Sequence, residues 1–432
     1  MRVKKTSLKS LLRVGASVLA TTTCLVGAAH AAGATLGLND NNTTTPIKHV
    51  IVIVGENRTF DHLFATYVSP SGDSVQNLLS EHIINADGTP GAAFGKAKQN
   101  QASDTTSYSV SPTITGPYKT LPPPNLNFTP NQATYTAPPF VSAAVAAQYD
   151  YGLLPKDLVV LTTGASGLPF QTLDTRIPNV QKLKSGPFQL TPSVNYDQYA
   201  NSPVHRFYQM FQQMDCSVTY ATANNPSGCK EDLWPWVEVT VGAGTNGHPQ
   251  KPGFNNESTH EGATAMGFYN VQQGDIPYLK ALADQYTILD NYHQPAKGGT
   301  GLDSLYLGFA DDIWYSDGAG NATVPPANQI ENPDPQAGTN NWYTQDGYSG
   351  GTYSNCSDTT QPGVASVAAY LSALSVPLNC DTGHYYLLNN YNPGYLGDGS
   401  PAIPSQGPFT IPPSSTPSIG DVLIANQISW VY

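Results

Sequence analysis

The feature that most constrains the fold of this chain is a run of apolar, largely β-branched residues near its N-terminal end. Residues 47–54 have the sequence Ile-Lys-His-Val-Ile-Val-Ile-Val and are followed by Gly55. A near-continuous apolar run is typical of a strand buried on both faces, as in a parallel sheet covered by helices. The stretch Tyr286–Tyr292 is expected to form a second buried strand. We therefore predict an α/β fold.

Helices are expected in three other segments, Pro203–Met214, Pro277–Asp284 and Leu302–Phe309. His205 would lie in the first turn of the first helix. Pro277 can open the second helix, because proline is tolerated at the first helical position.

The length of 432 residues exceeds the size at which one hydrophobic core keeps growing, so we expect a large domain with insertions, or two domains. We divide the chain into a signal peptide (1–31), a linker of small and polar residues (32–45) and one domain (46–432). Irregular insertions are expected at about 69–145 and 315–420, which are rich in Pro, Gly and Asn.

The N-terminal residues predict export. Five basic residues precede the apolar stretch Val14–Ala29, and Ala29-His30-Ala31 forms an Ala-x-Ala cleavage signal. We expect a secreted or periplasmic protein. No second apolar run approaches the length of a membrane span, so no transmembrane segment is expected. Cys24 lacks the preceding small residue of a lipobox, and lipid anchoring is the alternative.

The net charge limits the partners. Removal of residues 1–31 takes away five basic and no acidic residues, which changes the net charge from −12 to about −17. Such an acidic surface repels nucleic acid and anionic membranes at long range, although a focused cationic site can still bind a phosphate. We expect no nucleic-acid partner.

Four cysteines remain after the signal peptide and allow three connectivities, and an oxidising compartment favours disulfides. Proximity in sequence leads us to predict the pairs Cys216–Cys229 and Cys356–Cys380. Their spacings match no zinc-site pattern, so metal binding by these thiols is not expected.

The first candidate site is Glu56-Asn57-Arg58-Thr59-Phe60-Asp61-His62, directly after the predicted strand. Ligands in open α/β sheets bind beyond the carboxyl ends of the strands. The carboxylate of Glu56 and the amide oxygen of Asn57 would suit a hard or borderline cation. The alternative is a strand-to-helix turn in which Asn57 and Asp61 make capping hydrogen bonds.

The second candidate site is Gly298-Gly299-Thr300-Gly301. The glycines let the backbone approach a ligand closely, and N–H groups at the start of a helix suit a phosphoryl group. The hydroxyl of Thr300 becomes a nucleophile when a metal lowers its pKa. The alternative is an ordinary N-cap threonine.

Histidines complete the list of candidates. His205, beside a phosphoryl site, could protonate a leaving alkoxide or bind an oxyanion; the alternative is a structural histidine in a helix. His293 follows the second predicted strand and leaves the same alternatives open. Gly164-Ala165-Ser166-Gly167 does not form a Gly-x-Ser-x-Gly nucleophile elbow, which counts against a serine esterase.

Together these segments resemble the bacterial phospholipases C and related acid phosphatases. The resemblance rests on Ile47–Phe64, His205-Arg206-Phe207-Tyr208-Gln209, Pro277–Tyr292 and Gly298-Gly299-Thr300, and covers most of residues 45–432 in order. It implies an alkaline-phosphatase-like α/β/α sandwich around a mainly parallel sheet. It also implies a divalent metal ion and a phosphoester substrate, either a phospholipid head group or a small phosphomonoester.

The resemblance assigns roles to individual residues. It implies that Glu56, Asn57 and Thr300 are metal ligands and that Thr300 is the nucleophile. His205 would lie in the phosphate-binding pocket, with Gly299 beside it.

The chain departs from the family pattern in two places. Asp303 and Ser304 stand where the family usually has Asn followed by His or Arg, and a carboxylate beside a dianionic phosphate is unfavourable by roughly a few kcal/mol. Asp303 could instead be an extra metal ligand. Family members also continue beyond the segment that resembles residues 419–432, with a His-His pair, another histidine and an acidic pair. We therefore expect an incomplete C-terminus or a degenerate relative, with little or no activity for residues 1–432.

The sequence thus predicts a secreted, metal-dependent phosphoester hydrolase with a threonine nucleophile. The alternative is a secreted, non-catalytic relative that keeps the fold and binds a ligand through its Tyr- and Asn-rich loops.

Overall fold

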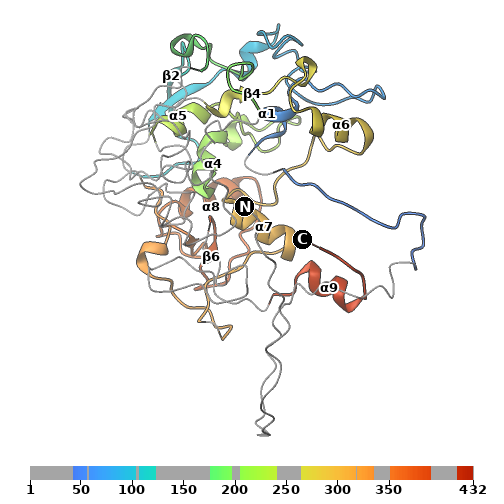
Figure 1. Ribbon diagram of the computed structural model, residues 1–432. Helices are drawn as coiled ribbons and strands as arrows, with labels where there is room; N and C mark the ends of the chain where they lie inside the picture. The colour runs from blue at the N-terminus through green and yellow to red at the C-terminus, as the bar shows by residue number, and fades with distance from the viewer. Residues whose placement is uncertain are drawn as a thin grey trace, which may run out of the picture. The chain divides into compact units, whose positions relative to one another are not determined.

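The computed structural model describes nine parts of the chain and is shown in Figure 1. The described residues are 42–55, 58–103, 107–122, 176–196, 205–240, 264–317, 319–334, 351–390 and 416–431. Two compact units are distinguished, Met1–Val50 with Leu423–Tyr432, and Ile51–Val422. The predicted signal peptide, 1–31, lies outside the described residues.

Helices of five to ten residues occur along the described chain (Figure 1). The α-helices are α1 (Phe60–Phe64), α4 (Phe207–Met214), α5 (Trp234–Thr240), α6 (Pro277–Gln285), α7 (Thr300–Phe309), α8 (Val364–Ala373) and α9 (Ile419–Ala425). Short 3-10 turns are η1 (Phe94–Ala97), η2 (Val180–Lys182), η3 (Val218–Tyr220), η5 (Thr264–Met266), η6 (Val271–Gln273) and η7 (Ala327–Gln329).

Two of the three predicted helices begin close to where the sequence places them. α6 has Pro277 at its first position, where the missing N–H removes no helical hydrogen bond. α7 begins at Thr300, two residues before the predicted start. α4 begins at Phe207, so the prediction that His205 lies in its first turn is wrong. Arg206, with an extended ψ of 148°, is the N-cap, and His205 precedes it.

The described strands form three two-stranded sheets. β1 (Asn100–Ser103) and β2 (Thr113–Pro117) are antiparallel, as are β5 (Tyr353–Ser354) and β6 (Tyr386–Leu387), whereas β3 (Phe188–Gln189) and β4 (Gly267–Phe268) are parallel. This mixture of helices and small sheets is compatible with an α/β protein. The α/β/α sandwich around a mainly parallel sheet stays a prediction.

The two predicted buried strands are wrong in this structure. Residues 47–54 form no strand, and the side chains of Ile51 and Val52 are 85% and 78% exposed. Thr287–Tyr292 is also irregular, and Leu289 is 62% exposed. An apolar run forms a buried strand only where other strands pair with its backbone. No described strand pairs with either segment.

Parts of the two regions expected to be irregular are ordered into elements. β1 and β2 lie within residues 69–145, and α8 lies within residues 315–420. The division of the chain into one domain with insertions stays a prediction.

Two neighbouring hydrophobic clusters position the segment after β6. α7 contributes Leu302 to a cluster with Ile313, Tyr353 and Leu387. The next residue, Leu388, belongs instead to a cluster built from α4 and α8, which contains Tyr208, Phe211, Val367 and Tyr370. Adjacent residues therefore pack on α7 at one side and on α4 and α8 at the other.

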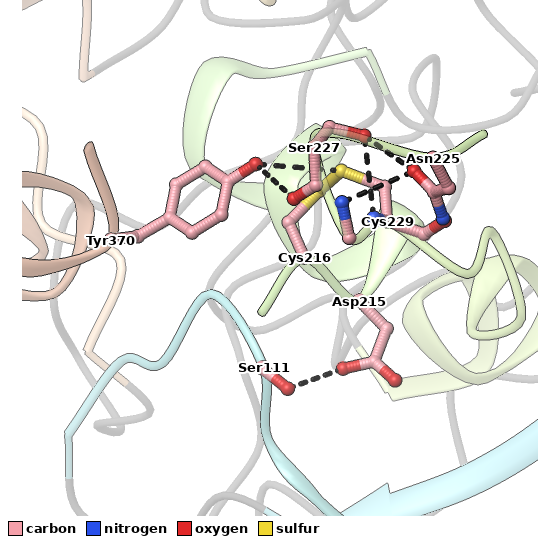
Figure 2. Close-up of a disulfide and its surroundings, with 8 residues drawn as sticks. Ser111, Asp215, Cys216, Asn225, Ser227, Cys229 and Tyr370 are labelled. Atoms are coloured by element: carbon pink, nitrogen blue, oxygen red, sulfur yellow. Dashed lines mark hydrogen bonds between the residues drawn. A yellow bond between two sulfur atoms is a disulfide. The ribbon is translucent and has the colours of Figure 1, made fainter. Parts of the chain in front are cut away.

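Disulfides join Cys216 to Cys229 and Cys356 to Cys380, the two pairs expected from the sequence. Figure 2 shows the first pair, where the Tyr370 hydroxyl donates a 2.9 Å hydrogen bond to the Ser227 carbonyl oxygen. Across the described parts of the chain, no helix is long and apolar enough to span a bilayer.

Candidate functional site

Thr300, the predicted nucleophile, is the first residue of α7. The preceding residue, Gly299, has extended backbone angles and its carbonyl oxygen accepts a 3.2 Å hydrogen bond from the Asp303 N–H. Gly299 is therefore the N-cap, because the N-cap carbonyl accepts the first helical hydrogen bond. The alternative interpretation of Thr300 as an N-cap residue does not apply in this structure.

Asn390 caps this helix from another part of the chain. Its side-chain Oδ1 accepts a 2.6 Å hydrogen bond from the N–H of Gly301. Gly299 needs to lack a side chain here, since an added Cβ would lie 2.7 Å from the Asn390 nitrogen. The N–H of Gly299 donates to the Leu388 carbonyl oxygen at 3.3 Å. Two N–H groups expected to face a phosphate are thus bonded within the protein, and phosphate binding by Gly299 stays a prediction.

The start of α4 is held in the same way by the neighbouring residue. Asn389 is fully buried, and its Oδ1 accepts a 2.9 Å hydrogen bond from the N–H of Phe207. Phe207 is the first residue of α4 and follows His205 by two positions. The side chain of Asn389 therefore replaces a helical partner that the N–H of Phe207 cannot have.

The two asparagines bring two predicted site segments together. Asn389 bonds the start of α4, beside His205, and Asn390 bonds the start of α7, which carries Thr300. Successive Cα atoms are only about 3.8 Å apart. The segments that carry His205 and Thr300 therefore approach the same short stretch of chain, although 95 positions separate them in the sequence.

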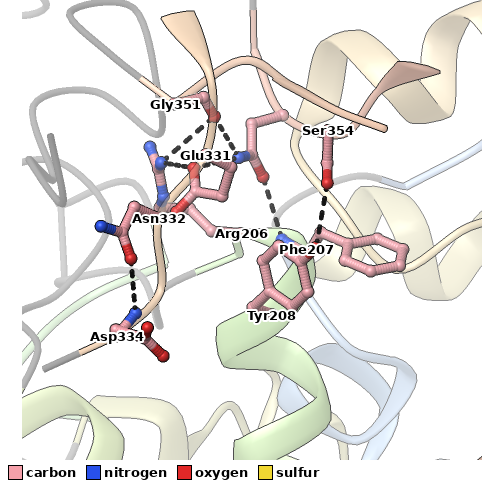
Figure 3. Close-up of polar contacts among 9 residues, drawn as sticks. Arg206, Phe207, Tyr208, Glu331, Asn332, Asp334, Gly351 and Ser354 are labelled. Atoms are coloured by element: carbon pink, nitrogen blue, oxygen red, sulfur yellow. Dashed lines mark hydrogen bonds and ion pairs between the residues drawn. The ribbon is translucent and has the colours of Figure 1, made fainter. Parts of the chain in front are cut away.

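A buried ion pair supports this arrangement (Figure 3). The guanidinium of Arg206 pairs with the carboxylate of Glu331, and both side chains are fully buried. Asn389 Nδ2 donates to Glu331 Oε2 at 3.0 Å and to the Gly351 carbonyl oxygen at 2.6 Å. Burial raises the pKa of Glu331 to about 7, although the charge of Arg206 acts in the opposite direction.

Gly351 is a structural requirement of this ion pair. Its φ of +67° lies in the left-handed region, and an added Cβ would collide with the side chains of Glu331 and Arg206. A glycine therefore allows the backbone carbonyl to reach Asn389.

Charged groups also gather around the loop that precedes α7. The ammonium of Lys297 lies 4.6 Å from the centroid of the Phe211 ring on α4. Burial lowers the pKa of Lys297, and the charge of Glu231 raises it. His293 is exposed, with its Nε2 2.9 Å from Asn291 Oδ1.

The predicted metal ligands Glu56 and Asn57 lie outside the described residues. Directly after them, the Thr59 hydroxyl accepts a 3.2 Å hydrogen bond from the His62 N–H and caps α1. Asp61, proposed as the alternative capping residue, instead accepts from the Leu78 N–H at 3.0 Å. Burial raises the pKa of Asp61 to about 6. Among the described residues, no three His, Cys, Asp or Glu side chains are grouped closely enough to hold a metal ion.

The two departures from the family pattern lie in the first turns of α7. Asp303 is buried and Ser304 is half-buried. The positive end of the helix dipole favours a carboxylate in the first turn. This effect offsets part of the unfavourable interaction that the sequence predicts between the Asp303 carboxylate and a phosphate.

A cavity of about 370 Å³ lies elsewhere in the same unit. It is lined by segments Tyr67–Val75 and Ala283–Asp290, including Asp73, Asp284 and Asp290. None of the predicted site residues that the structure describes lines it, and its acidic walls do not suit an anionic phosphate.

The sequence analysis missed the residues that connect the site. Asn389, Asn390 and Glu331 belong to no motif recognised above. Arg206 lies within the recognised motif, but its partner Glu331 is 125 positions away. The available signal was the Asn-rich stretch Leu387–Asn390, whose side chains could be assigned no partner from spacing alone.

Comparison with protein families supports a hydrolase that acts on phosphoester bonds. Residues 155–432, more than half of the chain, match the model of the Phosphoesterase family. The matched residues include His205 and Thr300 but not Glu56 and Asn57. No curated protein and no solved structure matches the chain. From the family match, the chain belongs to the Phosphoesterase family.

Proposed function

We propose that this protein is an exported, metal-dependent phosphoester hydrolase with Thr300 as its nucleophile. Family membership supports a hydrolase that acts on phosphoester bonds. The observation that carries the assignment of residues is the pair Asn389 and Asn390, whose side chains bond the starts of α4 and α7. The substrate would be a phospholipid head group or a small phosphomonoester.

In the proposed reaction, the Thr300 hydroxyl oxygen attacks phosphorus in line with the leaving oxygen and loses its proton to water. The bond from phosphorus to the leaving oxygen breaks as the new bond forms, and His205 donates a proton to the leaving alkoxide. The products of this step are phosphothreonine and the free alcohol. Water then attacks the phosphothreonine, which restores the threonine hydroxyl and releases the phosphate group.

A divalent metal ion bound by Glu56, Asn57 and Thr300 would supply positive charge beside the phosphoryl oxygens and lower the pKa of the attacking hydroxyl. Glu56→Ala should therefore lower the bound metal and the phosphatase activity together. The tests use a protein lengthened at its C-terminus to include the later motifs of family members, called the full-length protein below. Metal content measured by elemental analysis of this purified protein checks the first effect independently of turnover. Unchanged metal content and turnover would contradict the metal site and favour the alternative, a strand-to-helix turn.

Removal of the nucleophile is the direct test of the proposed function. Thr300→Ala should reduce turnover by more than roughly 10³-fold, because the attacking group of a catalytic unit carries most of the rate enhancement. Thr300→Ser should retain part of the activity, because the hydroxyl is the reacting group. The measurement is hydrolysis of p-nitrophenyl phosphate and of bis(p-nitrophenyl) phosphate by the full-length protein over several divalent metals. Near-normal turnover by Thr300→Ala would exclude a nucleophilic role.

A non-catalytic, ligand-binding relative is the second candidate. The occupied N–H groups of Gly299 and Gly301 favour it, because these donors would otherwise be available to a phosphoryl group. The same assay separates the two functions. Binding of phosphate without hydrolysis of either ester by the wild-type protein would support the non-catalytic relative.

A further inference from the structure

We propose that Asn389 and Asn390 are positioning residues, which fix Thr300 at the start of α7 relative to His205 before the start of α4. This inference rests on the proposed function and names two further residues that its reaction needs. Neither asparagine is assigned a contact with the substrate.

Asn390 fixes the first turn of α7 from outside the helix. Only 3% of its surface is exposed, and its Oδ1 accepts the N–H of Gly301 at 2.6 Å. On the other side of Thr300, the Gly299 backbone lies against Asn390, with no room for a Cβ. Both chain neighbours of Thr300 are therefore in contact with one buried residue.

Asn389 fixes the start of α4 through both ends of its amide. Its Oδ1 accepts from the Phe207 N–H, while its Nδ2 donates to Glu331 and to the Gly351 carbonyl oxygen. The amide therefore has one orientation that satisfies all three bonds. Because Glu331 also pairs with Arg206, the residue that follows His205, the connection to α4 is made twice.

The chain that carries the asparagines is itself held on both sides. The N–H of Leu388 donates to the Thr352 carbonyl oxygen at 2.8 Å, and its carbonyl oxygen accepts from the Gly299 N–H. The N–H of Leu387 donates to Ile313 at 2.9 Å, and both leucine side chains are buried. Asn389 and Asn390 therefore extend from a fixed backbone and can transmit its position to the two helix starts.

The rate of in-line attack on phosphorus depends strongly on where the reacting groups are held. A displacement of about 1 Å in the reacting groups can reduce a rate by roughly 10²-fold. Loss of one asparagine bond should therefore affect the chemical step more than it affects the initial binding of an ester.

The decisive experiment compares Asn390→Ala with Asn390→Asp in the full-length protein, using p-nitrophenyl phosphate as the probe. Asn390→Ala removes the acceptor for Gly301 and should lower kcat by about 10- to 100-fold with a smaller change in KM. Asn390→Asp keeps an oxygen acceptor at the same place and should recover most of the kcat. An aspartate variant as slow as the alanine variant would contradict positioning through this hydrogen bond.

Asn389 provides an internal comparison. Asn389→Asp keeps the acceptor for Phe207 but loses both donated bonds and places a second carboxylate beside Glu331. We expect it to be slower than Asn390→Asp. Equal kcat values for the two aspartate variants would contradict the distinct roles assigned to the two side chains.

Asn270 is a matched control for loss of a buried asparagine. It is fully buried and caps η6, and its side chain bonds to Thr66, Ala86 and Gln272. Asn270→Ala should lower the Tm but leave kcat near the wild-type value at a temperature where the variant is folded. A kcat loss equal to that of Asn390→Ala would show a general effect of destabilisation and overturn the proposal.

Two further outcomes separate the proposal from the proposed function. If the wild-type protein hydrolyses the probe and Asn390→Ala keeps its kcat, positioning is wrong and the hydrolase assignment stands. If the wild-type protein hydrolyses neither ester, the proposed function fails and the positioning role fails with it. If Asn390→Ala does not fold, Asn390→Ser replaces it. The serine oxygen lies one bond closer to the backbone than Oδ1 and does not reach the Gly301 N–H, so this variant should show the same loss of kcat.

Discussion

At the scale of single residues, two buried carboxyl groups lie beside the first disulfide. Asp215 Oδ1 accepts a 2.5 Å hydrogen bond from the Ser111 hydroxyl (Figure 2), and Asp232 Oδ2 accepts from Asn100 at 2.7 Å. Burial and the charge of Asp215 raise the pKa of Asp232 to about 6, against the opposing effects of Asn100 and Lys230. The folded protein therefore binds a proton here that the unfolded chain releases at lower pH.

The pH dependence of stability follows from this shift. A carboxyl group whose pKa is raised on folding contributes stability that is fully present below its unfolded pKa, near 4, and lost as the pH rises through about 6. The Tm of the wild-type protein should therefore fall between pH 4 and pH 7. Asp232→Asn removes this group and should make the fall smaller, because the amide keeps an oxygen acceptor and carries no charge. Thermal unfolding in matched buffers across this range measures the effect.

Asp358 is the control with the opposite sign. The hydroxyl and the N–H of Thr360 both donate to its carboxylate and lower its pKa. Its contribution is present above its unfolded pKa and lost as the pH falls, so Asp358→Asn should not reduce the fall between pH 4 and pH 7. Identical profiles for Asp232→Asn and the wild-type protein would contradict the role of Asp232.

Some residues of the candidate site could be predicted from the sequence, and others could not. The position of Thr300 at a helix start follows from the glycines before it and the apolar residues after it, which are local signals. The roles of Asn389, Asn390 and Glu331 depend on partners that are 38 to 182 positions away. Spacing along the chain carries no information about such partners.

At the scale of elements, the first disulfide ties the end of α4 to a short loop. Cys216 follows α4 by two positions, is 1% exposed and packs in the cluster with Phe211 and Tyr370. Cys356 is half-buried, and Cys380 is also half-buried. The two disulfides therefore close loops of comparable length, 13 and 24 positions, in different surroundings.

The surroundings predict unequal effects of disulfide removal. Replacement of Cys356 and Cys380 by serine should lower the free energy of unfolding by about 3 kcal/mol, from the added freedom of the unfolded chain. Replacement of Cys216 and Cys229 should lower it further, because a serine hydroxyl then occupies the apolar cluster. Urea denaturation at equilibrium measures both double variants. An equal or smaller loss for the Cys216 and Cys229 variant would contradict the packing role.

Helices were predicted better than strands, for a physical reason. Pro277 at the start of α6 and the apolar repeat of α7 act within one helix, so neighbouring residues are sufficient evidence. A strand needs a partner from elsewhere in the chain. β3 and β4, each of two residues, pair across 79 positions and have no local signal of comparable strength.

At the scale of the whole molecule, the structure and the sequence pattern differ over residues 47–54. The pattern predicts a strand in a parallel sheet, whereas in the structure this run forms no strand and is exposed. The difference matters for the site, because the predicted metal ligands Glu56 and Asn57 follow this run directly. If the run were a strand of a sheet, its pairing would fix the orientation of these two ligands. If it is unpaired, contacts with the residues around α1 would have to fix that orientation.

Hydrogen exchange distinguishes the two arrangements. Peptide N–H groups without hydrogen bonds exchange near the rate of an open chain, and those of central strands exchange only on large-scale opening. In the structure, the N–H groups of Ile51, Val52 and Ile53 make no hydrogen bond, and neither do those of Thr287–Tyr292. We therefore expect both segments to exchange at the earliest measured time, while Asp303–Phe309 in α7, bonded as a helix, stays protected. Protection of residues 51–53 equal to that of α7 would instead place this run in a paired strand and support the parallel sheet that the sequence predicts.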